Sequence, residues 1–194
     1  MPSISKIPQH INQYATRLAL EINNEPVENA MTIGDYNKYI RLSDPIKGAI
    51  GWTVVDVFDK SRKDIIVHNH PNGVVLSMQD VITAIAYDIK KIFASTNAGF
   101  TALDLTTTKK SISKNELLAR SVKANEEMEI FANKLFVQQS IKPDINFYDI
   151  DQKIIKKMDD ALDKEGYLKL KEFAKWSGAI FSDVKWSDYA KSKK

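Results

Sequence analysis

The sequence contains no cysteine, which excludes disulfide bonds, thiolate metal sites and a cysteine nucleophile. It also has little excess charge, since 28 Lys and Arg against 25 Asp and Glu give a formal net charge of +3. So small an excess does not predict binding to nucleic acid. No stretch approaches the roughly 20 apolar residues of a membrane-spanning helix, and the N-terminal residues lack the apolar run of a signal peptide. We therefore expect a cytoplasmic protein with neither a membrane nor a nucleic-acid partner.

The remaining composition, 43% hydrophobic and 27% charged residues, is typical of a soluble globular protein. Hydrophobic periodicity predicts one α/β domain over residues 1–110. The expected elements are a helix over residues 7–23, strands over 27–33, 36–42, 64–68 and 100–107, and a helix over 77–93 whose buried stripe is Val81, Ile85, Ile89 and Ile92.

A helical C-terminal extension is predicted for residues 111–194. Ser113 and Glu116 have the spacing of a capping box at the start of a helix. The predicted helices cover residues 117–139, 151–164 and 168–176, with Gly166 separating the last two.

Two of the three histidines belong to a candidate functional site. His68 and His70 lie at the end of a predicted strand, and strand alternation places both imidazoles on the same side of the backbone. Pro71 then breaks the strand, and Asp80 follows in the first turn of a helix whose N-cap is predicted to be Ser77. The sequence therefore predicts that two imidazoles and a carboxylate meet at the end of this strand.

Two imidazoles and one carboxylate suit zinc, with the fourth position left for water, which is the catalytic pattern. A simpler interpretation also exists for each residue. Histidines are frequent in turns, Asp80 would complement the dipole of its helix, and Ser77 would be an N-cap only. The His-x-His pair alone does not decide between these interpretations.

The whole segment from His68 to Asp80, HNHPNGVVLSMQD, resembles the JAMM motif of MPN-type zinc metalloproteases. That motif reads His-x-His-Pro, a spacer and Ser-x-x-Asp, with a glutamate on an earlier strand. The family includes deubiquitinating isopeptidases, and similar HNHPNG segments occur in domains of phage head-associated proteins and bacterial toxins. The resemblance covers residues 27–109, and the spacer here is one residue shorter than in many members. It implies a cytidine-deaminase-like mixed sheet flanked by helices.

The resemblance also implies a role for each matching residue. His68, His70 and Asp80 would be the zinc ligands, and Ser77 would donate a hydrogen bond to the developing oxyanion. The glutamate of the family, the general base, matches Glu28 best because this residue begins the first predicted strand.

Two other glutamates are weaker matches to the general base. Glu25 precedes the predicted strand and is the second choice, and Glu21 falls in the predicted helix. The implied reaction is hydrolysis of a peptide or isopeptide bond in a protein substrate, including ubiquitin-like proteins.

Parts of the sequence also match three other kinds of protein. A non-catalytic MPN-like interaction module of a phage or bacterial assembly is the main alternative. An HNH-type nuclease is disfavoured by the His70-Pro71 turn and the small net charge. Residues 161–172 have part of the pattern of an EF-hand loop, but Ala161 stands where the first calcium ligand is needed.

Overall fold

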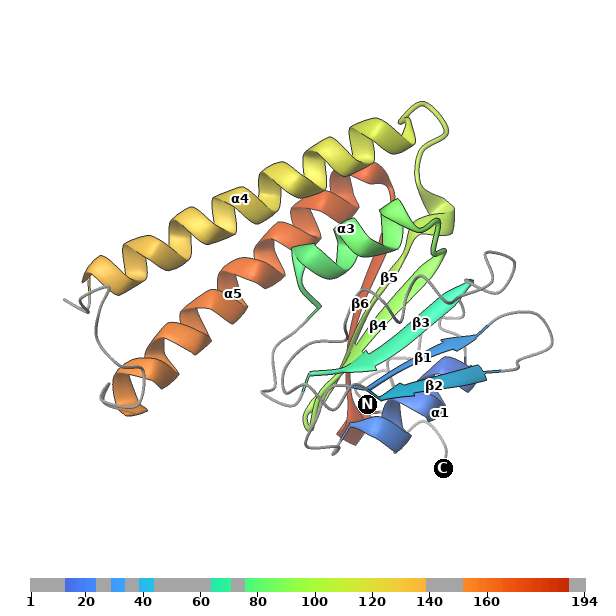
Figure 1. Cartoon of the computed structure of the whole chain (residues 1–194), viewed down its shortest axis with the longest axis horizontal. Coiled ribbons are helices and arrows are strands. Elements are labelled where there is room, and N and C mark those ends of the chain that lie inside the picture. Colours follow the sequence, from blue (N-terminus) through green and yellow to red (C-terminus); the bar gives the residue numbers. More distant parts are fainter. Residues whose placement is uncertain are drawn as a thin grey trace, which may run out of the picture.

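The computed structural model describes residues 13–23, 29–33, 39–43, 64–70, 76–138 and 152–188. These residues form a six-stranded mixed sheet with helices on both faces, which confirms the predicted α/β class (Figure 1). The elements are α1 (Gln13–Ile22), β1 (Asn29–Ile33), β2 (Tyr39–Ser43), β3 (Ile65–Asn69), α3 (Met78–Ala86), β4 (Lys91–Ser95), β5 (Gly99–Asp104), the 3-10 helix η3 (Leu105–Thr107), α4 (Lys114–Gln138), α5 (Gln152–Ser177) and β6 (Ile180–Lys185).

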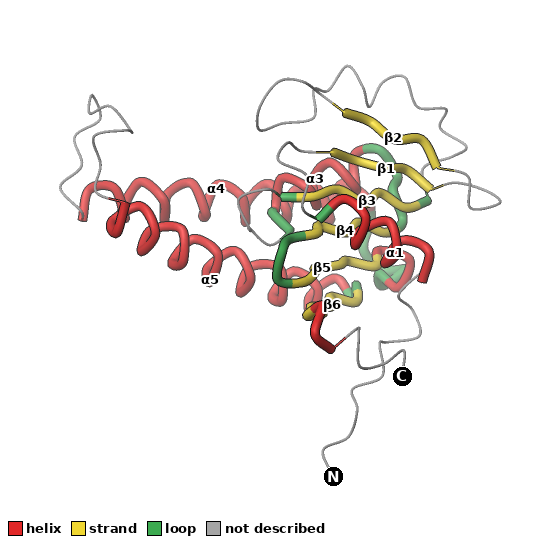
Figure 2. Tube along the Cα trace, turned by 90° about the horizontal axis from the view of Figure 1, so that it is seen from below, coloured by secondary structure: helices red, strands yellow, loops and turns green. Residues whose placement is uncertain are grey.

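The strands lie in the order β2-β1-β3-β4-β5-β6. Only β3 and β4 are parallel, and α3 makes the connection between them; the other neighbouring strands are antiparallel. Figure 2 shows α1 on one face of the sheet and α3, α4 and α5 on the other. In the element order, the helix that carries Asp80, α3, comes next after β3.

The sheet separates two hydrophobic clusters. Alternation along β3 sends Ile65 and Val67 towards α1, and it sends Ile66 towards α3. All five residues of β3 are buried, as the apolar run at 64–68 predicts. The strand that carries His68 is thus held on both faces.

Several other predicted elements are confirmed within the described residues. The strands β1 and β2 form an antiparallel pair. At the start of α4, Ser113 N donates to Glu116 Oε2 over 2.8 Å and Glu116 N donates to Ser113 Oγ over 3.3 Å, so the predicted capping box is present. The predicted helix over 7–23 corresponds to α1, and its residues before Gln13 lie outside the described residues.

The helix predicted over residues 77–93 is wrong in its second half. The helix α3 ends at Ala86, and Asp88 adopts a left-handed conformation with φ 59°. The next residues form β4, with Ile92 in the cluster beneath α3 and Phe93 in the cluster beneath α1. Ile89 and Ile92 match the helical period by coincidence, since consecutive apolar residues buried on opposite faces are typical of a central strand.

The break predicted at Gly166 is also wrong, because α5 is one continuous helix. Gly166 lies four residues after Leu162 and four before Leu170, on the side that packs against α4. A helical glycine costs roughly 1 kcal/mol relative to alanine, and burial of this stripe outweighs that cost. Because residues 161–172 are helical, they also lack the loop that an EF-hand requires.

The C-terminal segment is not helical throughout. Gly178, with φ 83°, ends α5, and β6 follows as the edge strand beside β5. Residues 111–194 therefore contribute a strand to the sheet of residues 1–110. The helices α4 and α5 lie side by side and extend well past the sheet (Figure 1). None of the helices described is both long and apolar enough to span a membrane.

Two glycine substitutions test this arrangement. A Cβ on Gly99 would overlap the backbone carbonyl of Val184 and lie 2.9 Å from Lys185 Cα, whereas a Cβ on Gly166 meets only Met128 Cε at 3.7 Å. We expect Gly99→Ala to lower the free energy of unfolding by about 1–3 kcal/mol through overpacking of β5 on β6. Gly166→Ala should raise it by about 0.5–1 kcal/mol. Urea unfolding followed by circular dichroism measures both, and a loss of stability in Gly166→Ala would contradict a continuous α5.

Candidate metal centre

The two histidines extend from the end of β3. His68 lies in the strand, and the amide of His70 donates to the Ser95 carbonyl over 2.8 Å, which continues the pairing with β4 by one residue. The two imidazole rings lie 4.6 Å apart between centroids in an edge-to-face arrangement. The prediction that both rings occupy the same side of the strand is confirmed.

Asp80 meets both imidazoles. His68 Nε2 lies 2.9 Å from His70 Nε2 and 3.4 Å from Asp80 Oδ1, and His70 Nε2 lies 3.7 Å from Asp80 Oδ2. Ligand atoms at 2.0–2.1 Å from a tetrahedral zinc ion are roughly 3.3 Å apart. The two imidazole nitrogens and the His68–Oδ1 pair are close to this spacing, whereas His70 lies 3.7 Å from the other oxygen, Oδ2. One ligand atom from each of the three side chains lies within 4.8 Å of the others, so the group could hold one ion. Within the described part of the chain, no other group of three His, Cys, Asp or Glu ligand atoms converges in this way.

The centre is partly enclosed. The His68 side chain is 4% exposed, and those of His70 and Asp80 are 16% and 20% exposed. His70 and Asp80 therefore reach the surface in part, while His68 is held in the interior.

Ser77 fixes the orientation of the Asp80 carboxylate. The Ser77 amide and hydroxyl both donate to Asp80 Oδ2, over 2.7 and 2.6 Å. In return, the Asp80 amide donates to Ser77 Oγ over 3.1 Å, so the N-terminus of α3 carries a reciprocal capping box. Two of the acceptor sites on Oδ2 are thus occupied, and Oδ1 is turned towards His68.

The same contacts keep Asp80 ionised. Burial alone would raise the pKa of Asp80, but the charges of His68 and His70, with hydrogen bonds from His68 and Ser77, hold it well below its usual range. A carboxylate that stays ionised at neutral pH is the form that ligates a cation.

Two positioning residues have no signal in the sequence. The buried Thr101 on β5 accepts a hydrogen bond from the Leu76 amide over 2.8 Å, and so ties the residue before Ser77 to the sheet. The Ser95 carbonyl holds His70, as described above. Both contacts depend on β4 and β5 lying beside β3, and the strand β4 was not predicted.

Three predicted parts of the site lie outside the described residues, namely Glu28, Glu25 and the turn at 71–75. Glu21 is described, and it is exposed on α1. The helix α1 covers the face of the sheet opposite α3, so Glu21 is not a neighbour of Asp80 (Figure 2).

Comparison of this chain with family models, with curated proteins and with solved structures gives no match. The interpretation of the centre therefore depends on its own geometry and on the motif.

Removal of the Thr101 hydroxyl tests how the centre is held. Thr101→Val keeps the shape of the side chain but leaves the Leu76 amide without its acceptor, which we expect to cost about 1–3 kcal/mol of stability. The matched control is Thr83→Val, whose hydroxyl bonds only to a carbonyl of its own helix and is exposed; its effect should stay within about 0.5 kcal/mol. Thermal unfolding of both variants gives the comparison, and equal effects would show that the Thr101 contact does not hold the helix start.

Proposed function

We propose that this protein is a zinc-dependent hydrolase of the JAMM type, which cleaves a peptide or isopeptide bond in a protein substrate. The observation that carries the proposal is the convergence of His68, His70 and Asp80, each of which offers one ligand atom within 4.8 Å of the others. A zinc ion held there would supply Lewis acidity and a hydroxide nucleophile near neutral pH. A substrate carbonyl would approach the partly exposed side chains of His70 and Asp80.

The finer fold assignment is part of this proposal. The HxHP segment at the end of a central strand, the SxxD segment at the start of the next helix, and a preceding antiparallel strand are in the order that the MPN family requires. These features support a cytidine-deaminase-like MPN domain with an added pair of long helices.

Glu28 remains the proposed general base. Its support is the register of β1 on β3. Ala30, which follows Glu28 by two residues in the sequence, lies opposite His68. The Glu28 carboxylate would take a proton as water adds to the carbonyl carbon. It would then return that proton to the amine nitrogen as the C–N bond breaks.

Ser77 has two proposed roles. Its hydroxyl donates to Asp80 in the structure, which orients the ligand. Donation to an oxyanion would require this hydroxyl to rotate away from Asp80, while the Ser77 amide keeps its own hydrogen bond to Oδ2.

The first test is metal content. We expect about one zinc per chain in protein purified without a histidine tag or chelator, and loss of the metal in Asp80→Asn and His70→Gln. Chelation should lower the free energy of unfolding by roughly 3 kcal/mol where free zinc had stood at a hundred times its Kd.

Elemental mass spectrometry and thermal unfolding give the two readouts of this test. The matched control is Asp88→Asn, an exposed aspartate just beyond the other end of α3 that pairs with Lys114, and it should keep its zinc. Absence of zinc from the supplemented wild-type protein would sink the hydrolase proposal and leave the interaction module as the interpretation.

The second test separates the base from the ligands. Glu28→Gln should keep its zinc and lose about 10²–10⁴-fold in kcat on fluorogenic substrates with linear or lysine ε-amide linkages. Glu21→Gln on α1 is the control and should match the wild-type protein. Unchanged activity in Glu28→Gln, with activity lost in Glu25→Gln, would reassign the base to Glu25.

A further inference from the structure

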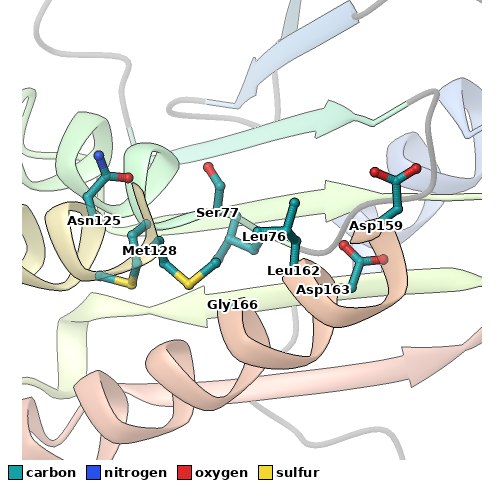
Figure 3. A pocket seen from close by; sticks show the side chains of 9 residues that line it. Leu76, Ser77, Asn125, Met128, Asp159, Leu162, Asp163 and Gly166 are labelled. Carbon is teal, nitrogen blue, oxygen red and sulfur yellow. The ribbon is translucent and has the colours of Figure 1, made fainter. Parts of the chain in front are cut away.

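A cavity of about 230 Å³ lies beside the candidate metal centre, between the start of α3 and the two long helices. Ser77 lines this space, and Figure 3 shows Met128 of α4 on one side of Ser77 and Leu162 of α5 on the other. The walls are mostly apolar, because Leu76, Leu162 and two flexible methionines line them, and Asn125 adds one polar side chain.

The cavity and the metal centre share one residue. Ser77 lines the cavity, and the same side chain donates to the Asp80 carboxylate over 2.6 Å. A substrate whose scissile carbonyl reached Asp80 and the histidines would therefore place a neighbouring side chain at the mouth of this cavity.

One end of the cavity is acidic. Asp159 and Asp163 stand one turn apart on α5, and Figure 3 shows both carboxylates at the same end of the space. No ion pair joins either of them to a cationic side chain within the residues that the structure describes.

Like charges at this spacing repel each other. Burial and the neighbouring carboxylates of Asp159 and Asp160 raise the pKa of Asp163. A cation placed between the two carboxylates would reverse this effect.

We propose that the cavity is a specificity pocket for one arginine or lysine side chain of the substrate, with its aliphatic stem on Met78, Met128 and Leu162 and its charge on Asp159 and Asp163. The assignment to a substrate depends on the proposed hydrolase function; the binding of the basic side chain does not.

The size and polarity of the cavity favour this occupant. Pockets for whole small molecules are roughly 300–1,000 Å³, so this cavity suits a single side chain. Arginine and lysine combine an apolar stem with a charged end, which matches apolar walls that finish in two carboxylates. Asp159 is exposed and Asp163 is half-buried. An aliphatic side chain would gain nothing from the charge of either carboxylate, and an acidic one would be repelled.

The first experiment measures binding without catalysis. Full-length protein labelled with ¹³C at the methionine methyl groups is titrated with Nα-acetylarginine amide and with its uncharged isostere, Nα-acetylcitrulline amide, with and without zinc. We expect the arginine compound to shift the Met78 and Met128 methyl signals, while Met158, which is buried in the core, serves as the unperturbed reference. The citrulline compound should bind about two- to fivefold more weakly.

The double variant Asp159→Asn/Asp163→Asn should lose this discrimination, and Asp160→Asn is the matched control because Asp160 does not line the cavity. Equal shifts with the two compounds, discrimination retained in the double variant, or no shift at millimolar arginine compound would overturn the pocket. Zinc content of the double variant should equal that of the wild-type protein.

The proposed role of the cavity in substrate choice is tested by cleavage kinetics. Peptides that differ only in arginine or citrulline near the scissile bond should show about a two- to fivefold preference in kcat/KM for arginine, abolished in the double variant. Arginine binding in a protein without zinc or activity would refute the hydrolase and keep the pocket. Cleavage with no such preference would keep the hydrolase and refute the pocket's role in substrate choice.

Discussion

The capping box between Ser77 and Asp80 is the interaction on which the candidate centre depends. The amide and the hydroxyl of Ser77 both bond to one oxygen of Asp80, and the Asp80 amide bonds back to the hydroxyl. A motif that commonly stabilises a helix start here also determines which carboxylate oxygen faces His68. The local stability of α3 and the geometry of the centre are therefore linked through the same three hydrogen bonds.

The sheet makes that linkage effective. Because β3 and β4 are parallel, the chain must cross over between them, and α3 is the crossover. The helix starts near the end of β3 at which the histidines lie, so a carboxylate in its first turn reaches them. The opposite face of the sheet is closed by α1, where Ile22 and Phe93 are fully or nearly fully buried. Both faces of the sheet are packed, and the histidines lie where β3 ends.

The sequence predicted the centre better than the fold around it, for a physical reason. The relation of His68 to His70 and that of Ser77 to Asp80 are local, so strand alternation and capping rules determine them. The parts that failed depend on tertiary contacts. Ile89 and Ile92 fit the helical stripe of α3 until the neighbouring strands place Ile92 and Phe93 on opposite faces of the sheet.

Gly166 and the last strand failed for the same reason. From sequence alone, a glycine inside a helical pattern predicts the end of the helix. Gly166 instead packs against Met128 of α4, a contact that the sequence does not show. The strand β6 has no independent signal, because Phe181 and Val184 gain their burial only from β5 and the layers on its two faces. Contacts such as Thr101 with the Leu76 amide, 25 positions apart in the chain, follow from this topology and from no local pattern.

Electrostatics gives the two neighbouring sites opposite signs. Two neutral imidazoles and one carboxylate around a divalent ion would leave a net positive charge at the centre. The pair Asp159 and Asp163 is negative, and Ser77 lines their cavity and bonds to Asp80 at the centre. A substrate that spans both would have its carbonyl oxygen drawn to the first site and a basic side chain drawn to the second. Such opposite charges would fix the direction in which a chain lies across α3, so orientation would come from a few charged groups instead of an extended groove.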